Sequence, residues 1–331
     1  MHMFAAFYFV IILTIEKEWS ISYDQLIRLW SLGALLIGLG AIPFGWLSDR
    51  WSRSGTMTIM FIGMGLASIL CGLSTSISFL FISLSLLGLF CSIYHPVGIP
   101  WVIHSANKQG RALGINGIFG GVGIGSGAFV AGTLTELLNW QLAFILPGFI
   151  SIIIGFILIY FIFINKISYK NIFINNIEQD HSRNEMILIS LIMLISMFAL
   201  GLTFHNTQTA LPKVFEIRID NINSIQIGLM IGIIYFISGA TTFVGGLLAD
   251  RFNLKTIYLI GIFLQFPCYL GIAYVSGYSL VFLCILAAVF NASILPTENL
   301  LLSKFTPQKY HGVVYGIKFI LAFGSGPISV F

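Results

Sequence analysis

The chain has 331 residues, of which 57% are hydrophobic and only 8% are charged. Soluble domains average about 45–50% apolar and about 25% charged residues, so this composition excludes a water-soluble fold. The net charge of +4 is too small for a surface that binds nucleic-acid phosphates. All four cysteines lie inside apolar stretches, so we expect no disulfide framework, no metal site and no cofactor.

Apolar stretches of membrane-crossing length recur along the whole chain. A bilayer core of roughly 30 Å needs about 20 mostly apolar residues per helix. We count eleven stretches, at approximately 3–15, 25–47, 56–73, 78–104, 112–134, 142–164, 186–204, 224–247, 256–275, 279–302 and 313–331. They are continuous rather than alternating, which favours helices over a transmembrane barrel. The sequence therefore predicts an all-α membrane protein with about eleven helices.

Basic residues are concentrated on one side of the expected membrane. The loops at 48–54, 105–111, 165–185, 249–255 and 304–311 hold eleven Lys and Arg residues, and the opposite loops hold three, Lys17, Lys213 and Arg218. Basic loops remain in the cytoplasm. We therefore expect a multi-pass protein of the inner membrane with a cytoplasmic amino terminus.

A loop motif occurs twice. Residues 45–50 read GWLSDR and residues 246–251 read GLLADR, at a constant offset of 201. Both copies lie on the same side, so the repeats are parallel about an axis along the membrane normal. We expect a six-helix bundle at 1–164, a cytoplasmic linker at 165–185 and a second bundle at 186–331. The second bundle has five helices within this chain. We expect a twelfth helix, and the start of the chain's first helix, to lie outside the sequence.

The repeated motif resembles the Gly-x-Leu-x-Asp-Arg signature of the major facilitator superfamily, here followed by Arg53. Residues 94–96 (YHP) and 110–114 (GRALG) are similar to bacterial efflux members of the fosmidomycin-resistance type. Those antiporters often carry Gly-Pro where this chain has Gly127-Ala128. The resemblance implies a major facilitator fold of two six-helix bundles, a monomer that rocks one half against the other around a small-molecule substrate.

The resemblance also implies a conformational latch in the loop motif. Its members are Gly45, Asp49, Arg50, Arg53, Gly246, Asp250 and Arg251. The two glycines permit close helix approach, and each Asp can accept bonds from a nearby Arg or face a helix amino terminus, where an anion gains about 0.3–1 kcal/mol. The alternative is a polar turn with cytoplasmic charge.

Small residues mark the fifth predicted helix. Gly117, Gly121 and Gly125 recur every four residues and share a helical face. Such a stripe favours tight helix packing in lipid over a direct substrate role.

Ionisable groups inside a bilayer cost about 2.5–3.5 kcal/mol at its centre, so each is a functional candidate. Glu298 is a candidate for proton coupling or, equally, for a structural ion pair with Lys318 at similar depth. His95 precedes Pro96, which should bend the fourth helix, and could bind substrate or protons or simply bond between helices. Asn116 is the repeat mate of Lys318, and we expect it to face a substrate cavity between the halves from the fifth helix.

The sequence has no nucleotide-binding loop, so transport energy should come from a gradient. The favoured function is a secondary transporter that exports a small organic solute in exchange for protons. A proton-coupled uptake symporter and a non-transporting membrane sensor are the alternatives. An enzyme is not expected, because the intramembrane charges are few and scattered.

Overall fold

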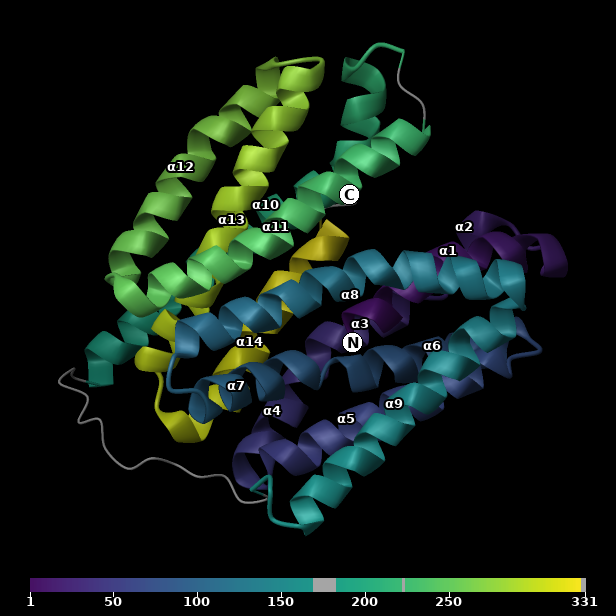
Figure 1. Ribbon diagram of the computed structural model, residues 1–331, viewed down its shortest axis with the longest axis horizontal. Helices are drawn as coiled ribbons and strands as arrows, with labels where there is room; N and C mark the ends of the chain where they lie inside the picture. Colours follow the sequence, from purple (N-terminus) through teal and green to yellow (C-terminus); the bar gives the residue numbers. More distant parts are fainter. Residues whose placement is uncertain (169–182, 222–223, 329–331) are drawn as a thin grey trace. The chain divides into compact units, whose positions relative to one another are not determined.

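The computed structural model describes residues 1–168, 183–221 and 224–328 (Figure 1). Within these ranges the chain is almost entirely helical and contains no β-strand. Eight helices of this described part are long and apolar enough to cross a membrane. Helices α1, α8 and α14 coincide with the other three predicted stretches. The prediction of an all-α membrane protein is confirmed.

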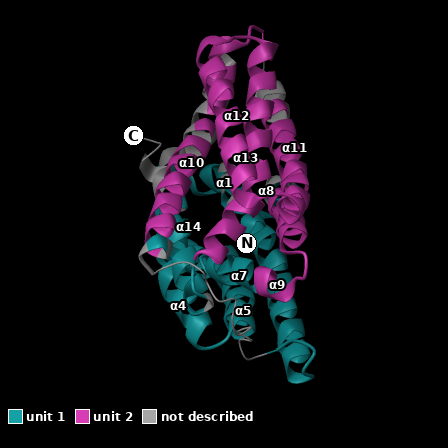
Figure 2. Cartoon of the chain, turned by 90° about the vertical axis from the view of Figure 1, so that its left-hand side faces the viewer, with its two compact units in different colours: residues 1–101, 126–186, 306–324 teal, residues 102–125, 187–305, 325–331 magenta. Residues whose placement is uncertain are grey.

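The chain divides into two compact units (Figure 2). Unit 1 comprises residues 1–101, 126–186 and 306–324, and unit 2 comprises residues 102–125, 187–305 and 325–331. Segments from both predicted halves therefore occur in each unit. The division of the sequence into bundles at 1–164 and 186–331 stays a prediction, and most of the predicted linker, residues 169–182, lies outside the described residues.

Unit 1 is built mainly from the amino-terminal helices. They are α1 (His2–Trp19), α2 (Tyr23–Arg28), α3 (Ser31–Leu39), α4 (Ala41–Arg50), α5 (Arg53–Gly72), α6 (Ile77–Cys91), η1 (Tyr94–Gly98), α9 (Trp140–Phe163), η2 (Gln308–Tyr310) and most of α14 (His311–Ile328). Helices α5 and α9 pack closely along each other. Gly65 and Gly148 allow this approach, because each faces the backbone carbonyl of the other.

Unit 2 is built mainly from the later helices. They are α10 (Arg183–Arg218), α11 (Ser224–Arg251), α12 (Leu254–Tyr274) and α13 (Tyr278–Lys304), and the first part of α8 (Gln109–Leu137) joins them. The short helix α7 (Ile99–Ser105) crosses the boundary between the units. Helix α13 packs against both α11 and α12.

Helices restart after tight loops because a polar residue caps the first turn. The Ser52 hydroxyl accepts a bond from the Gly55 N–H at 3.0 Å at the start of α5. The Asn139 Oδ1 accepts one from Leu142 at 2.7 Å at the start of α9. Asn253 does the same at the start of α12, at 3.3 Å. Each cap satisfies an amide that has no partner within its helix and contributes about 1 kcal/mol.

Helix α10 is longer than its apolar stretch. That stretch ends near residue 204, yet the helix continues to Arg218, so placing Lys213 and Arg218 in a loop was wrong. Leu211, Phe215 and Ile219 recur every four residues and are buried in the core of unit 2. The Arg218 guanidinium also donates to the carbonyl oxygens of Ile272 and Ala273, at 2.8 and 2.9 Å, at the end of α12. The buried apolar residues and the contact of Arg218 with the end of α12 explain why α10 remains helical through a segment that is polar by composition.

Where the sequence predicts a bend, Pro96 lies in a π-helical segment, η1, and the bend itself stays a prediction. Proline lacks an N–H and its ring clashes with the preceding turn. A wider turn accommodates both effects, and such turns often occur at functional sites. His95 lies inside this segment.

Candidate functional site

The second copy of the loop motif contacts the start of another helix in unit 2. At the end of α11, the Asp250 carboxylate accepts hydrogen bonds from the backbone N–H groups of Gly110 and Arg111, each at 2.8 Å. Both donors belong to the first turn of α8, where amides have no intrahelical partner. The carboxylate therefore lies at the positive end of the α8 dipole.

The first copy makes the matching contact in unit 1. The Asp49 carboxylate accepts a bond from the Val313 N–H at 3.2 Å, and also one from the Gly312 backbone, at the start of α14. Gly312 and Val313 are the repeat mates of Gly110 and Arg111. The carboxylate of Asp49 is thus held by the same two backbone positions as that of its mate in unit 2.

Arginines of the motif differ in what they contact. The Arg53 Nη2 lies 3.7 Å from the Asp49 Oδ1, and both side chains are buried. Arg50 instead lies with its guanidinium 4.9 Å from the centre of the Trp46 ring. Arg251 is exposed. Of the Arg residues predicted for the latch, only Arg53 is therefore shown to pair with a motif carboxylate.

Glycines bring two backbones together beside each motif carboxylate. A Cβ atom on Gly45 would overlap the Gly312 carbonyl group, and one on Gly246 would overlap the Gly110 carbonyl group. Further along α8, Gly117 faces the Thr242 side chain and Gly121 faces the Gly239 Cα atom of α11, which a Cβ atom would approach to 3.3 Å. Gly125 also belongs to α8, but its surroundings lie outside the described residues. The described part of the stripe lies along α11.

The structure brings His95 and Lys318 together in unit 1. The His95 ring stacks on the Phe319 ring, with centroids 4.1 Å apart and an interplanar angle of 21°. The Lys318 side chain is 4% exposed, and its Nζ lies 5.3 Å from the centre of the same Phe319 ring. His2 contributes a second imidazole, whose centroid is 5.2 Å from that of His95. This is a compact cluster of basic and aromatic side chains, in which Lys318 is buried and His2, His95 and Phe319 are partly buried.

Glu298 lies in unit 2, 3% exposed, on α13. The Tyr258 hydroxyl from α12 hydrogen-bonds Glu298, and it also lies 2.9 Å from the Ser196 hydroxyl of α10. The sequence did not indicate Tyr258 as a site residue, because a tyrosine in an apolar stretch is usually explained by the hydrophobic surface that its ring buries. Glu298 and Lys318 belong to different units, so their ion pair stays a prediction. Asn116 lies in α8 with an intermediate exposure.

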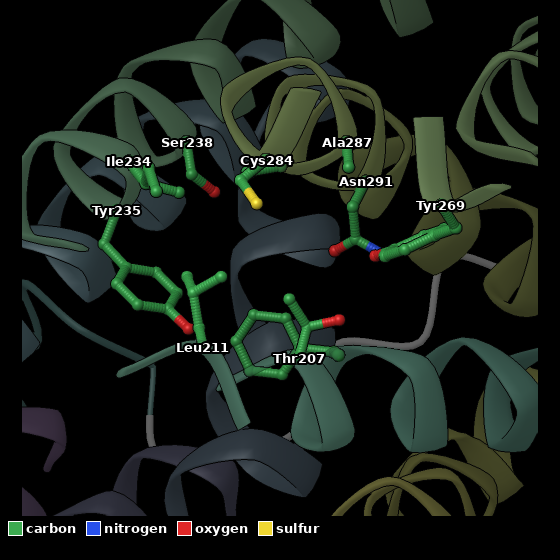
Figure 3. A pocket seen from close by; sticks show the side chains of 11 residues that line it. Thr207, Leu211, Ile234, Tyr235, Ser238, Tyr269, Cys284, Ala287 and Asn291 are labelled. Atoms are coloured by element: carbon green, nitrogen blue, oxygen red, sulfur yellow. The ribbon is translucent and has the colours of Figure 1, made fainter. Parts of the chain in front are cut away.

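A pocket opens among four helices of unit 2 (Figure 3). The space among these side chains, counted together with the solvent-open region at its mouth, is about 410 Å³. Its lining residues are Phe204, Thr207, Leu211, Ile234, Tyr235, Ser238, Tyr269, Cys284, Ala287, Ala288 and Asn291. Sequence reasoning did not find this pocket, since no helix alone contributes more than four of its residues.

Long apolar helices, a duplicated loop motif and a pocket lined from four helices define a multi-pass membrane protein of the transporter class. The chain belongs to the Major Facilitator Superfamily, whose sequence pattern matches residues 1–330.

Curated relatives are distant and longer. An "Uncharacterized transporter" of Buchnera aphidicola subsp. Schizaphis graminum is 24% identical over 274 residues, which are 80% of this chain and 63% of that protein. The riboflavin transporter RibZ of Clostridioides difficile is 28% identical over 147 residues, 43% of this chain and 32% of its own. The puromycin resistance protein pur8 of Streptomyces alboniger is 28% identical over 119 residues, 34% and 24% of the two chains. The matches span less than two thirds of each relative.

Solved structures share the fold. The transporter FucP in its outward conformation matches with a TM-score of 0.75 at 13% identity, covering 99% of this chain and 89% of FucP. A bacterial homologue of the iron transporter ferroportin in its outward-facing state matches with a TM-score of 0.72 at 16% identity, covering 99% and 87%. At these identities the likeness concerns the fold alone.

Proposed function

We propose that the protein is a secondary active transporter that moves a small organic solute across the inner membrane by alternating access. Proton-coupled efflux is the proposed direction, with a cytoplasmic amino terminus and a monomeric state. Family membership supports transport, and two relatives are named for riboflavin transport and puromycin resistance. Residues 94–96 and 110–114 support a relation to the fosmidomycin-resistance type of efflux protein.

One observation carries this proposal: the same carboxylate-to-helix contact occurs twice. Asp49 connects the end of α4 to the start of α14, 264 residues later. Asp250 connects the end of α11 to the start of α8, 140 residues earlier. Each contact joins a helix of one sequence half to a helix of the other. If the halves rock, both contacts break when the basic side opens and form when it closes.

The contacts act in this proposal as a latch that favours one rocking state. The free-energy difference needed is small, because a few kcal/mol separate conformers that are both populated. The close approaches at Gly45 and Gly246 let the carboxylates reach the amides. Packing of Gly117, Gly121 and Gly125 would let α8 slide against its neighbour.

Proton coupling is assigned to the buried groups. Glu298 is the first candidate for protonation, and its Tyr258 partner offers a hydroxyl that can donate to the carboxylate. His95, Lys318 and Asn116 are candidates for substrate or proton contacts. His95 and Lys318 lie against one aromatic ring, so a proton or an anionic group bound at one would affect the other.

A solute-accumulation screen in membrane vesicles tests the function, using the protein expressed from its full gene with and without an imposed pH gradient. Gradient-driven movement of a solute out of the cytoplasmic side supports proton-coupled efflux. Movement in the same direction as protons identifies an uptake symporter. Movement that ignores the gradient leaves facilitated diffusion, and binding without movement contradicts transport.

A further inference from the structure

The pocket of unit 2 has a lining without charge. None of its eleven residues is ionised at neutral pH. Five side chains carry a hydroxyl or an amide, namely Thr207, Tyr235, Ser238, Tyr269 and Asn291, and the others are apolar. A charged group that enters such a site loses its hydration without gaining a counter-charge, which is strongly unfavourable. The lining therefore selects an uncharged solute.

Aromatic rings bound the pocket on two sides. Tyr235 from α11 and Tyr269 from α12 lie on opposite sides of it (Figure 3). The Tyr235 ring is held edge to face against Phe204, with centroids 6.2 Å apart and an interplanar angle of 72°. Faces and edges of rings attract flat apolar surface. Such walls favour a planar or apolar body.

A directed chain of amide hydrogen bonds orients Asn291. The Gln265 Nε2 donates to the Gly261 carbonyl oxygen at 3.3 Å, which leaves its Oε1 as the acceptor facing α13. The Asn291 Nδ2 donates to that Oε1 at 3.3 Å. Gln265 is 3% exposed and does not line the pocket. Among the described residues, the Asn291 Oδ1 accepts no hydrogen bond, and it points into the pocket (Figure 3).

We propose that this pocket binds an uncharged solute with a planar or apolar body, and that the Asn291 Oδ1, oriented by Gln265, accepts a hydrogen bond from an O–H or N–H group of that solute. The inference names the solute class for the proposed transporter and rests on that function. Asn291 is the contact residue, and Gln265 is a positioning residue that acts through it. A buried acceptor favours solutes that present a donor, because an unmatched acceptor loses its bond to water.

Equilibrium dialysis on the full protein in nanodiscs tests the solute class. The probes are riboflavin, the common nucleosides and phenyl glycosides, each paired with its own phosphate ester. We expect at least one uncharged probe to bind and its phosphate ester to bind about 100-fold more weakly or not at all. Equal binding of the ester, or binding by no uncharged probe, overturns the inference.

Variants then test the contacts with the probe that binds. Asn291→Leu should weaken binding about three- to tenfold, as expected for one lost hydrogen bond, and Gln265→Met should weaken it to a smaller extent. Thr241→Val is the matched control, because among the described residues its hydroxyl bonds the Ile237 carbonyl of its own helix, at 2.7 Å, and does not line the pocket. Melting temperatures of all variants show that they remain folded.

Two further variants separate positioning from general destabilisation and locate the site. The double variant of Gln265→Met with Asn291→Leu should bind no more weakly than Asn291→Leu alone, because Gln265 acts only through Asn291. Additive losses contradict the positioning role. Ala287→Phe should fill the pocket and abolish binding. Unchanged affinity in that variant places the probe elsewhere and overturns the inference.

Failure of this inference is distinguishable from failure of the proposed transport function. Binding with the expected selectivity but no movement in vesicles contradicts transport and leaves the binding site intact. Gradient-driven movement of a solute that is unaffected by Asn291→Leu and Ala287→Phe supports transport and overturns the binding site.

Discussion

Gly45 and Gly312 meet backbone to backbone, so that a Cβ atom on either residue would overlap the carbonyl group of the other. The pair formed by Gly246 and Gly110 has the same geometry in unit 2. In both loops an Asp follows the first glycine by four residues and accepts a bond from the amides beside the second glycine. The glycines therefore set the distance at which the carboxylates can bind the helix starts.

Replacing Asp49 by Asn should weaken the contact between α4 and α14. The amide keeps one acceptor but loses the negative charge that faces the α14 dipole and Arg53. We expect the conformational equilibrium to shift by about 0.5–1 kcal/mol toward the state in which the two helix ends part. Spin-label distances between these ends and vesicle transport rates measure the shift. Lys166→Gln, which removes an exposed charge of unit 1 outside the motif, is the control. Unchanged populations and transport would count against the latch.

Gly121→Leu should slow turnover at least tenfold. A Cβ atom at this position would lie only 3.3 Å from the Gly239 Cα atom, so a leucine side chain must push α8 away from α11. Transport rate per folded molecule is the measurement. Gly232→Leu on α11 is the matched control, since nothing lies within 4 Å of a Cβ atom at that position. A Gly121→Leu protein with normal folding and turnover would contradict the sliding contact.

Glu298→Gln should abolish the dependence of transport on an imposed pH gradient. Solute exchange with the same pH on both sides of the membrane should be retained. The amide is close in shape to the carboxyl group and can still accept from Tyr258, but it cannot take up a proton. Accumulation in vesicles with and without the gradient is the measurement, and Glu298→Asp, which keeps a protonatable group, is the control. Retained coupling in Glu298→Gln would exclude the proton role.

Gly65→Ala should lower the free energy of unfolding by about 1–3 kcal/mol, as overpacking does in close-packed interiors. Its Cβ atom would lie 2.6 Å from Ile152 Cγ1 on α9. Gly38→Ala is the matched control, because its Cβ atom would have no neighbour nearer than the Ile320 Cα at 3.9 Å, and alanine has the better helix propensity by about 1 kcal/mol. Thermal unfolding in detergent compares the two. Equal melting temperatures would show that α5 and α9 can separate slightly without cost.

Most helices could be predicted from the sequence, because a membrane helix satisfies its own backbone bonds and needs only sufficient apolar length. The prediction failed at α10, whose last turns are polar by composition. There Phe215 is fully buried and Arg218 caps α12, and neither contact is visible in a hydropathy count. Pro96 indicated a departure from the regular α-helix, but the π-helical form of the segment depends on how the neighbouring turns pack.

The sequence by itself determined the apolar spans, the repeated loop motif and the short set of buried ionisable residues, since these follow from residue type and spacing along one helix. Only the tertiary structure decided that Asp49 and Asp250 bind helix starts far away in the chain, that His95 and Lys318 share one aromatic ring, and that Tyr258 accompanies Glu298. The pocket around Asn291 likewise became visible only in the tertiary structure. Hydrogen bonds and packing act over a few ångströms in space, and a linear pattern does not specify which distant residues come within that range.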